Sequence, residues 1–259
     1  MQVEVYPDAQ GAGRAAARMV ARLVQVQPSA VVGLASGHTM IPVFGELVRL
    51  HHEEGISFQK ATTINLDEYV GVGPGHHDSF HDFMRKRLSA QIDLRPEAFH
   101  LPNGMSADLE AECARYERLI RDLGGIDVQL LGLGRNGHVA FNEPGSDPGS
   151  RTRVVELAPE TRDVNAGDFR ELATTPARAL TLGLANILEA RRIILVVTGW
   201  EKAPILDRVL ATPATVALPA TFLHRHPEVT LIADLEAMEA YFARVGGESL
   251  SFRLPPPRG

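Results

Sequence analysis

The chain has 259 residues, 44% of them hydrophobic, with a formal net charge of −6 and one cysteine. The negative charge argues against nucleic acid or an anionic membrane as the main partner, and one cysteine excludes an intrachain disulfide or a multi-cysteine metal site. The N-terminus does not resemble a secretory signal, and no apolar run reaches the roughly 18 residues of a membrane span, so we expect a cytoplasmic location and no membrane partner.

Short apolar runs that are typical of buried strands alternate with amphipathic stretches along the chain. The expected strands are 3–6, 30–34, 62–66, 128–133, 153–157, 193–198 and 229–233. The expected helices are 15–26, 41–50, 107–123, 176–190 and 200–210. Alternation with short connections predicts an α/β fold, in which helices cover both faces of a mainly parallel sheet of about seven strands.

The composition along the chain predicts a single α/β domain over residues 1–253. The polar, loop-rich stretch 145–169 is a candidate lid, and the proline-rich tail 254–259 is expected to be extended and disordered. In sheets of this class ligands bind beyond the carboxyl ends of the strands, so the residues just after each strand are the candidates for a site.

Two strand ends carry groups that suit an anion. Ser36, Gly37, His38 and Thr39 follow the second strand, and hydroxyls with a glycine at a helix start can bind phosphate through backbone N–H groups. An ordinary turn with a hydroxyl N-cap has the same composition. Lys202 follows the strand at 193–198, where it can hold a phosphate as a point charge or remain a solvated lysine.

The third strand ends in two adjacent acids, Asp67 and Glu68. Side chains alternate along a strand, so one carboxylate can point into a cleft while the other points away. A partly desolvated carboxylate in that place can act as a general base, whereas a helix cap or a surface acid is the simpler alternative.

The segment after the fourth strand combines glycines with a histidine. Gly132, Gly134 and Gly137 form a GxGxxG pattern, but Pro144 follows soon and no helix is expected there, so a dinucleotide site is not indicated. His138 can exchange a proton near neutral pH, and either the Glu143 carboxylate or the Asn136 amide could fix its tautomer.

A histidine-rich cluster offers a competing site. His77 and His81 are four residues apart and could share a metal if they lay on one helix. The HExxH pattern is absent, and a solvated helix start capped by Asp78 explains the same residues, so we expect no metal.

Three segments together resemble the glucosamine-6-phosphate deaminase family. Residues 65–71 read NLDEYVG, 132–145 read GLGRNGHVAFNEPG and 150–153 read SRTR, and the similarity runs from about residue 3 to 240. The sister sugar-phosphate lactonases share the GH but lack FNEPG. The resemblance implies a Rossmann-like three-layer sandwich and an enzyme that releases ammonia from glucosamine 6-phosphate and isomerises it to fructose 6-phosphate, with no metal or organic cofactor.

The resemblance also assigns roles to residues. It implies that Asp67 moves a proton between C2 and C1, that His138 assists ring opening, and that Glu143 supports the histidine. Asn136 stands where many members have aspartate. The substrate-binding residues that it implies are Ser36, Gly37, His38, Thr39, Gly137 and Lys202.

This chain departs from the family pattern at the phosphate end. The family's lid commonly reads TRxxNAR, and its last arginine grips the phosphate, but residues 161–167 here read TRDVNAG and place Gly167 there. His38, in a loop that usually reads TGGT or TGST, could supply the missing cation. Arg153 fits the activator site of some members, but Val155 stands where those members have lysine, so we expect no such activation.

Three alternatives therefore remain beside deamination of glucosamine 6-phosphate. The first is the same chemistry on another, even non-phosphorylated, amino sugar, and the second is hydrolysis like that of 6-phosphogluconolactonase. The third is a sugar-phosphate sensor, although no DNA-binding segment precedes the first strand. The expected partner is a small amino-sugar phosphate, and the chain can form a homo-oligomer, since family members range from monomers to hexamers.

Overall fold

The computed structural model describes residues 1–169, 172 and 175–246. The tail at 254–259, for which the sequence predicts disorder, lies outside the described residues. Within them, no helix is both long enough and apolar enough to cross a membrane.

The centre of the molecule is a parallel sheet of seven strands, in keeping with the predicted α/β sandwich. Its apolar strands are buried almost throughout, because helices cover both faces. The strands, in their order across the sheet, are β1 (Gln2–Tyr6), β10 (Val229–Asp234), β9 (Ile193–Val197), β6 (Val128–Leu131), β2 (Val31–Leu34), β3 (Thr62–Asn65) and β5 (Phe99–His100).

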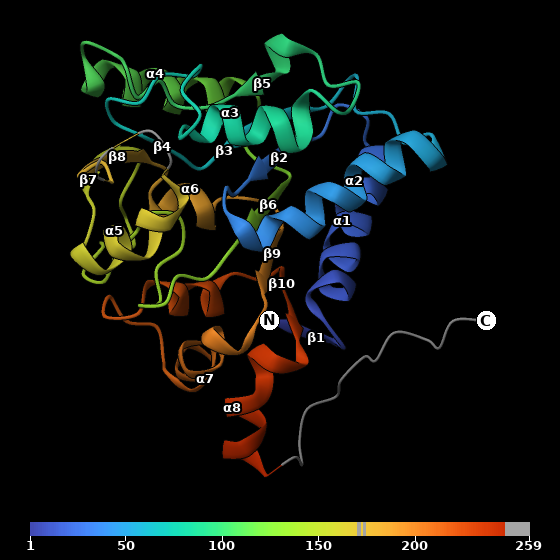
Figure 1. The fold of residues 1–259 in the computed structure, drawn as a ribbon, viewed down its shortest axis with the longest axis vertical. Coiled ribbons are helices and arrows are strands. Elements are labelled where there is room, and N and C mark those ends of the chain that lie inside the picture. Colours follow the sequence, from blue (N-terminus) through green and yellow to red (C-terminus); the bar gives the residue numbers. More distant parts are fainter. Residues whose placement is uncertain (170–171, 173–174, 247–259) are drawn as a thin grey trace.

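The helices pack on the two faces of this sheet, with α1 and α2 on one side and α6 on the other (Figure 1). Asp8, Asp108 and Asp234 begin three of the helices, and each side chain accepts a hydrogen bond from a backbone N–H in the first turn. The helices are α1 (Ala9–Val26), α2 (Ile41–Glu54), α3 (Phe80–Met84), α4 (Leu109–Asp122), α5 (Pro159–Asn165), α6 (Leu184–Leu188), α7 (Ala203–Ala211) and α8 (Leu235–Val245), with a π-helical turn η2 (Arg85–Ser89) and the 3₁₀ turns η1 (His38–Met40), η3 (Pro96–Ala98), η4 (Ala166–Asp168), η5 (Trp200–Lys202) and η6 (Pro219–Arg225).

A second, antiparallel sheet corrects two of the predictions. It consists of β4 (Asp67–Tyr69), β8 (Arg178–Thr181) and β7 (Arg153–Glu156), in that order. The strand expected at 153–157 in the main sheet is β7 of this second sheet, and the seventh strand of the main sheet is β5. The helix expected over 176–190 is wrong in its first half, because residues there pair between β4 and β7, and only α6 is helical. A pairing across more than 100 residues overrides the local helical spacing.

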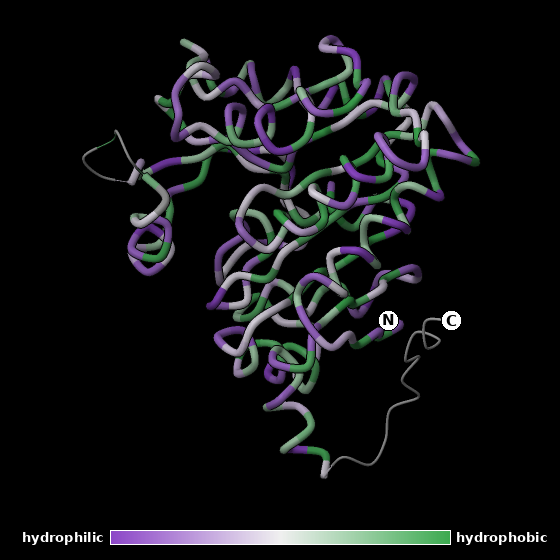
Figure 2. The backbone as a smooth tube through the Cα atoms, turned by 45° about the vertical axis from the view of Figure 1, so that its right-hand side comes forward, coloured by the Kyte–Doolittle hydropathy of each residue, from purple (hydrophilic) through white to green (hydrophobic). Residues whose placement is uncertain are grey.

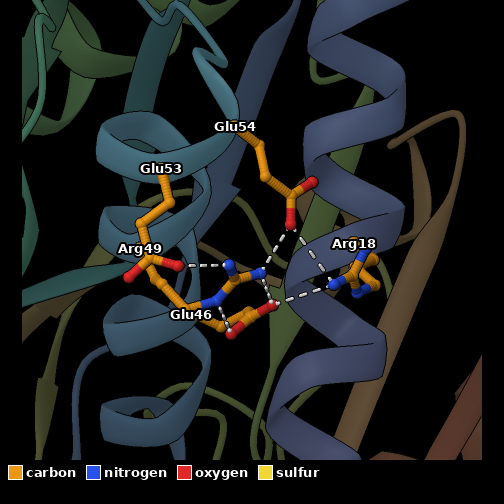
Figure 3. Close-up of polar contacts among 5 residues, drawn as sticks. All are labelled: Arg18, Glu46, Arg49, Glu53 and Glu54. Carbon is orange, nitrogen blue, oxygen red and sulfur yellow. Dashed lines mark hydrogen bonds and ion pairs between the residues drawn. The ribbon is translucent and has the colours of Figure 1, made fainter.

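Helices α1 and α2 are joined by a network of ion pairs (Figure 3). Arg49 on α2 contacts Glu46 at 2.8 Å, Glu53 at 2.8 Å and Glu54 at 2.7 Å. Arg18 on α1 reaches two of the same carboxylates, at 3.6 Å to Glu46 and 3.5 Å to Glu54. Glu46 is buried, and its hydrogen bonds to Arg49 lower the pKa of its carboxyl. The network thus compensates a carboxylate that the helix contact removes from water.

We expect replacement by alanine to have opposite effects on stability at two glycines of these helices. A Cβ on Gly13 of α1 would lie 2.5 Å from the Cβ of Pro42, so Gly13→Ala must push the helices apart and should cost about 1–3 kcal/mol of unfolding free energy. Gly45 on α2 has no atom within 4 Å of its Cβ position, so Gly45→Ala should stabilise by up to about 1 kcal/mol. Urea denaturation of both variants tests this pair, and a Gly13→Ala variant as stable as wild type would contradict the close packing.

The strand order also places the functional segments. Strands β9, β6, β2 and β3 are neighbours in the parallel sheet, so their carboxyl ends meet at one edge. The chain progresses outward in one direction through β2, β3 and β5, and in the other through β6, β9 and β10. The reversal between β2 and β6 is the type of switch point at which such sheets bind ligands.

Candidate active site

A pocket with a volume of about 180 Å³ opens at this edge of the sheet. It is lined by segments that follow β2, β3, β6 and β9 and by one face of α5. Of the residues proposed from the sequence, those that line it are Ser36, Gly37, His38, Thr39, Asp67, Asn136, His138 and Lys202. Gly137 and Glu143 do not line it and act on residues that do, as described below.

Asp67 and Glu68 occupy successive positions of β4 and point to opposite sides, as the sequence predicts. The Asp67 carboxylate lines the pocket. The Glu68 carboxylate accepts hydrogen bonds from the backbone N–H groups of Tyr69, Phe80 and His81, at 2.9, 3.0 and 2.9 Å. Glu68 therefore ties the strand to the start of α3 and holds Asp67 in place.

Burial gives Asp67 the properties of a base. The side chain is nearly inaccessible, and desolvation, with a smaller effect of the Glu68 charge, raises the pKa of its carboxyl from 3.8 to about 8. Burial likewise raises the pKa of Glu68, although its three backbone hydrogen bonds oppose that rise. A carboxylate with a raised pKa that faces a pocket can both take up and return a proton near neutral pH.

A tight turn brings His138 and Glu143 together. Val139 and Asn142 form an isolated antiparallel bridge, and Ala140 between them has a φ of 51°, a left-handed conformation that is unusual for alanine. The turn sets Nδ1 of His138 3.3 Å from Oε2 of Glu143. A hydrogen bond from Nδ1–H to the carboxylate fixes the tautomer and leaves Nε2 for a substrate.

Glu143 is the centre of a small hydrogen-bond network. Its Oε2 also accepts from Nδ2 of Asn136 at 2.6 Å, and its Oε1 accepts from Oγ1 of Thr161 at 2.5 Å. Burial raises the pKa of Glu143, but the hydrogen bonds and the charge of His138 outweigh it and hold that pKa at about 2. The carboxylate is thus ionised across the physiological range.

The sequence left open whether Glu143 or Asn136 fixes the tautomer of His138, and the structure does not support Asn136 in that role. Its amide does not contact the imidazole ring, because Nδ2 is directed to Glu143 while Oδ1 accepts the backbone N–H of His138 at 3.2 Å. The Glu143 carboxylate alone therefore fixes the tautomer, and Asn136 orients that carboxylate.

Two glycines shape the histidine loop. A Cβ on Gly134 would lie 2.2 Å from Nε2 of His138, so the imidazole packs directly on the backbone there. Gly137 has a φ of 89°, and its Cβ position is 2.8 Å from a methyl group of Leu218. The GxGxxG pattern thus serves the histidine, and no helix follows it as a dinucleotide site would require.

Two similar turns contribute residues to the pocket. After β2 come Ser36 and Gly37, then η1 and α2, and after β9 come Thr198 and Gly199, then η5 and α7. Both glycines have positive φ, and both long helices begin with proline in the first turn. In the second turn the N–H of Gly199 donates to both carboxylate oxygens of Asp234 at 3.0 Å. A turn of this geometry can therefore hold an anion, and the Ser36–Thr39 turn has this geometry and lines the pocket.

Lys202 adds the positive charge. Its neighbour Glu201 pairs with Arg135, and among the described residues Lys202 makes no ion pair. Burial, with the nearby charge of Arg135, lowers the pKa of Lys202. A desolvated ammonium without a carboxylate partner is costly, and an anionic ligand would compensate it.

The histidine cluster does not form a metal site. His77 precedes α3, so it does not share a helix with His81, and the two rings have different partners: Lys86 and Asp82 for His77, the carbonyl of Pro74 for His81. In the part of the chain that the structure describes, no three potential ligands come together.

Sequence reasoning missed the contribution of α5. Thr161 and Asn165 line the pocket, and so do Phe80 and Phe141, which pack around the ring of Tyr69. The stretch 145–169, expected to be loop-rich around the strand at 153–157, contains α5 in addition to β7. The four-residue spacing of Thr161 and Asn165 is a signal that could have indicated one helical face.

Comparisons with known proteins agree with this geometry. Residues 8–232 match the family model described as glucosamine-6-phosphate isomerases/6-phosphogluconolactonase. The chain is 46% identical over 223 residues to a glucosamine-6-phosphate deaminase of Geobacillus sp. (strain WCH70), covering 86% of this chain and 89% of that one. It is 45% identical over 222 residues to glucosamine-6-phosphate deaminase 1 of Bacillus subtilis (strain 168), covering 86% and 92%.

Solved structures show the same fold. One, of a protein described as a monomeric glucosamine-6-phosphate deaminase, is 42% identical and has a TM-score of 0.91, covering 93% of this chain and 100% of its own. The 6-phosphogluconolactonase of Trypanosoma brucei is 23% identical with a TM-score of 0.72, covering 92% and 97%, and so shares the architecture alone.

Proposed function

The chain belongs to the family of glucosamine-6-phosphate isomerases and 6-phosphogluconolactonases, and we propose that it is a deaminase that converts glucosamine 6-phosphate to fructose 6-phosphate and ammonia. The observation that carries the proposal is that a buried carboxylate, Asp67, and the tautomer-fixed His138 line one pocket, with Lys202 at its anion-binding end. The first two supply the proton transfers, and the third suits the phosphate.

Ring opening is assigned to His138. The hemiacetal opens when the C1–O5 bond breaks, O1 loses its proton and O5 gains one. Nε2 of His138 can take the proton from O1 and return it to O5, because Nδ1–H is held by Glu143. The ionised Glu143 stabilises the imidazolium that forms in between.

The isomerisation is assigned to Asp67. The ionised carboxylate removes the proton from C2, the electron pair forms a C1–C2 double bond, and the C1 oxygen takes up a proton from solvent, which gives an enolamine. Return of the proton to C1 leaves an imine at C2, and water adds there as ammonia departs. A base with a raised pKa suits this step, because the same group must accept the C–H proton and then release it.

The phosphate is assigned to the Ser36–Thr39 turn and to Lys202. The turn offers backbone N–H groups and two hydroxyls, and Lys202 offers a half-buried charge. His38 lines this pocket and also a neighbouring one, together with Gly167. We propose that His38 supplies the positive charge that an arginine at the position of Gly167 supplies in other members of the family.

Ammonia release from a panel of amino sugars tests the proposal. We expect turnover of glucosamine 6-phosphate and far weaker turnover of free glucosamine, because Lys202 and the turn bind the phosphate. Efficient turnover of the free sugar would favour the alternative substrate, and hydrolysis of a sugar-phosphate lactone without ammonia release would favour the lactonase. A folded protein that is inactive on the whole panel would refute the proposal.

Gly167→Arg and Lys202→Met test the phosphate end in opposite directions. Among the described residues no atom lies within 4 Å of a Cβ on Gly167, so a side chain has room to leave the backbone there. Gly167→Arg should then lower KM for the phosphorylated substrate about tenfold, as expected of an added charge-assisted hydrogen bond. Lys202→Met should raise the same KM by at least as much. Neither should change KM for free glucosamine, and an equal effect on both substrates would contradict the assignment.

We further propose that the protein acts in the cytoplasm, as its sequence predicts. Its oligomeric state stays a prediction, although one relative of known structure is described as monomeric.

A further inference from the structure

Helix α5 contacts Glu143, the partner of His138, and strand β4, which carries Asp67. Thr161 and Asn165 are one helical turn apart and lie on the face of α5 that lines the pocket. Thr161 donates to Glu143, behind His138, and Nδ2 of Asn165 donates to the hydroxyl of Tyr69 at 3.0 Å, two residues beyond Asp67. In Figure 2 one part of the chain projects from the main body, and α5 belongs to this projecting part.

The two hydrogen bonds have different consequences. Tyr69 belongs to an aromatic cluster with Phe80 and Phe141, at ring distances of 4.6 and 5.6 Å, so the Asn165 contact seats the helix on this cluster and not on Glu143. The Thr161 contact ends on a carboxylate oxygen. Thr161 is 4% exposed, and water does not readily replace a hydroxyl buried to that degree.

The carboxylate of Glu143 divides its hydrogen bonds between two sides. Oε2 faces Asn136 and His138, and Oε1 faces Thr161. Asn136 and His138 are on the loop that follows β6, close to the carboxylate in sequence, whereas Thr161 comes from α5. The position of α5 therefore determines whether Oε1 has a donor, and with it how strongly the carboxylate attracts the imidazole N–H.

We propose that Thr161 is a positioning residue for the reaction, which completes the Glu143–His138 pair when α5 is seated on the pocket. The inference rests on the proposed function for its catalytic meaning, but the coupling itself is a property of the free protein. With Thr161 in place, the carboxylate is satisfied by neutral donors and the imidazole can act as a base. Without it, the carboxylate depends on the imidazole and favours the imidazolium form.

Other charged groups face the pair from the elements around it. They are the same in the variants below, so they do not alter the comparison. The titratable groups that line the same pocket are His38 on η1, Asp67 and Tyr69 on β4, Arg135 on the loop after β6, Glu160 on α5 and Lys202 on η5.

Nuclear magnetic resonance of the ring protons of His138 tests the coupling without any substrate. The His138→Gln variant identifies the signal among the ten histidines. In Thr161→Val, which keeps the shape and removes the hydroxyl, we expect the ring to titrate at a higher pH than in wild type, because the Glu143 carboxylate then depends more on the imidazole N–H. Thr161→Ser should restore the wild-type titration.

Asn165→Ala is the matched control. It removes the other hydrogen bond of the same helix but keeps the Thr161 hydroxyl that donates to Glu143, so we expect a smaller change in the His138 titration than in Thr161→Val. A Thr161→Val variant that titrates like wild type, or an Asn165→Ala variant that shifts as much, would overturn the inference.

Steady-state kinetics connects the coupling to turnover. The acid limb of kcat/KM for ammonia release, to which Asp67 also contributes, should move upward in Thr161→Val and return to its wild-type position in Thr161→Ser. If wild type releases no ammonia, the proposed function fails, while the titration still decides the role of Thr161. If the variant changes KM alone and its ring titration is normal, Thr161 is structural and the inference fails.

Discussion

Asp67→Asn is expected to lower kcat for ammonia release about 10²–10⁴-fold while the protein stays folded, because the amide cannot remove the proton from C2. Binding of glucosamine 6-phosphate should survive, since the phosphate site proposed above, at Lys202 and the Ser36–Thr39 turn, does not include Asp67. Asp122→Asn, at an exposed carboxylate on α4, is the control and should retain full activity. Ordinary turnover by Asp67→Asn would remove Asp67 from the mechanism.

The same substitution should stabilise the protein at alkaline pH. Burial raises the pKa of Asp67 from 3.8 to about 8, so the folded protein holds this proton more tightly than the unfolded chain does. The contribution of Asp67 to the unfolding free energy is therefore fully present below about pH 4 and is lost progressively as the pH rises toward 8. Asp67→Asn avoids this loss, so its unfolding free energy should exceed that of wild type by on the order of 1 kcal/mol or more at pH 8, and by little at pH 4.

Activity should follow the opposite pH trend. The base must be ionised, so kcat/KM of wild type should rise with pH toward about 8 along a limb to which Asp67 contributes. The ionised form of Asp67 is thus the form required for activity, but it is also the form that contributes least to the unfolding free energy. A stability difference that is the same at pH 4 and pH 8 would contradict the burial of a titrating carboxylate.

His138→Gln is expected to lower kcat about 10²–10⁴-fold by removing the acid–base group of ring opening. Gly134→Ala should do comparable damage without altering any polar group, because the added methyl overlaps the position of the imidazole, 2.2 Å from Nε2. Gly132→Ala is the matched control, since its Cβ would meet only a methyl group of Met40, at 3.9 Å. Ammonia release by all three variants checks the prediction.

Comparison of these variants distinguishes the effect of displacing the imidazole from the effect of removing it. If Gly134→Ala is active and His138→Gln is not, the ring can tolerate displacement and the close packing is not required for catalysis. If both glycine variants are inactive, the loop as a whole is sensitive, and the specific contact between Gly134 and His138 is not supported.

The main sheet was predictable because its signals are local. Buried parallel strands such as β2, β6 and β9 are continuous apolar runs, and each ends in residues with an evident chemical use. The strands β4, β5 and β8 were not predicted, since they have two to four residues and depend on partners distant in sequence. Residues 178–181 have no pattern that distinguishes a short strand from a helix without the pairing to β4 and β7.

The site shows the same division. The resemblance to a family and the motifs at the strand ends indicated Asp67, His138, Glu143 and Lys202. The alternative in which Asn136 accepts from the imidazole was wrong, because hydrogen-bond direction depends on the orientation of an amide that the sequence does not specify. Thr161 was not predicted, because its partner Glu143 is 18 residues away and on another element.

The left-handed backbone of Ala140 sets a limit on how this protein can be improved. Such a conformation costs an ordinary residue roughly 1–2 kcal/mol, and glycine would adopt it freely. A search for thermostable variants would therefore be drawn to this turn, where relief of strain is readily available. The methyl group, however, restricts the loop that sets His138 against Glu143, so a more comfortable turn would also be a looser one. Stability gained at this position and turnover are expected to trade against each other, and engineering for heat resistance is better directed to α2, where Gly45 has room for a side chain.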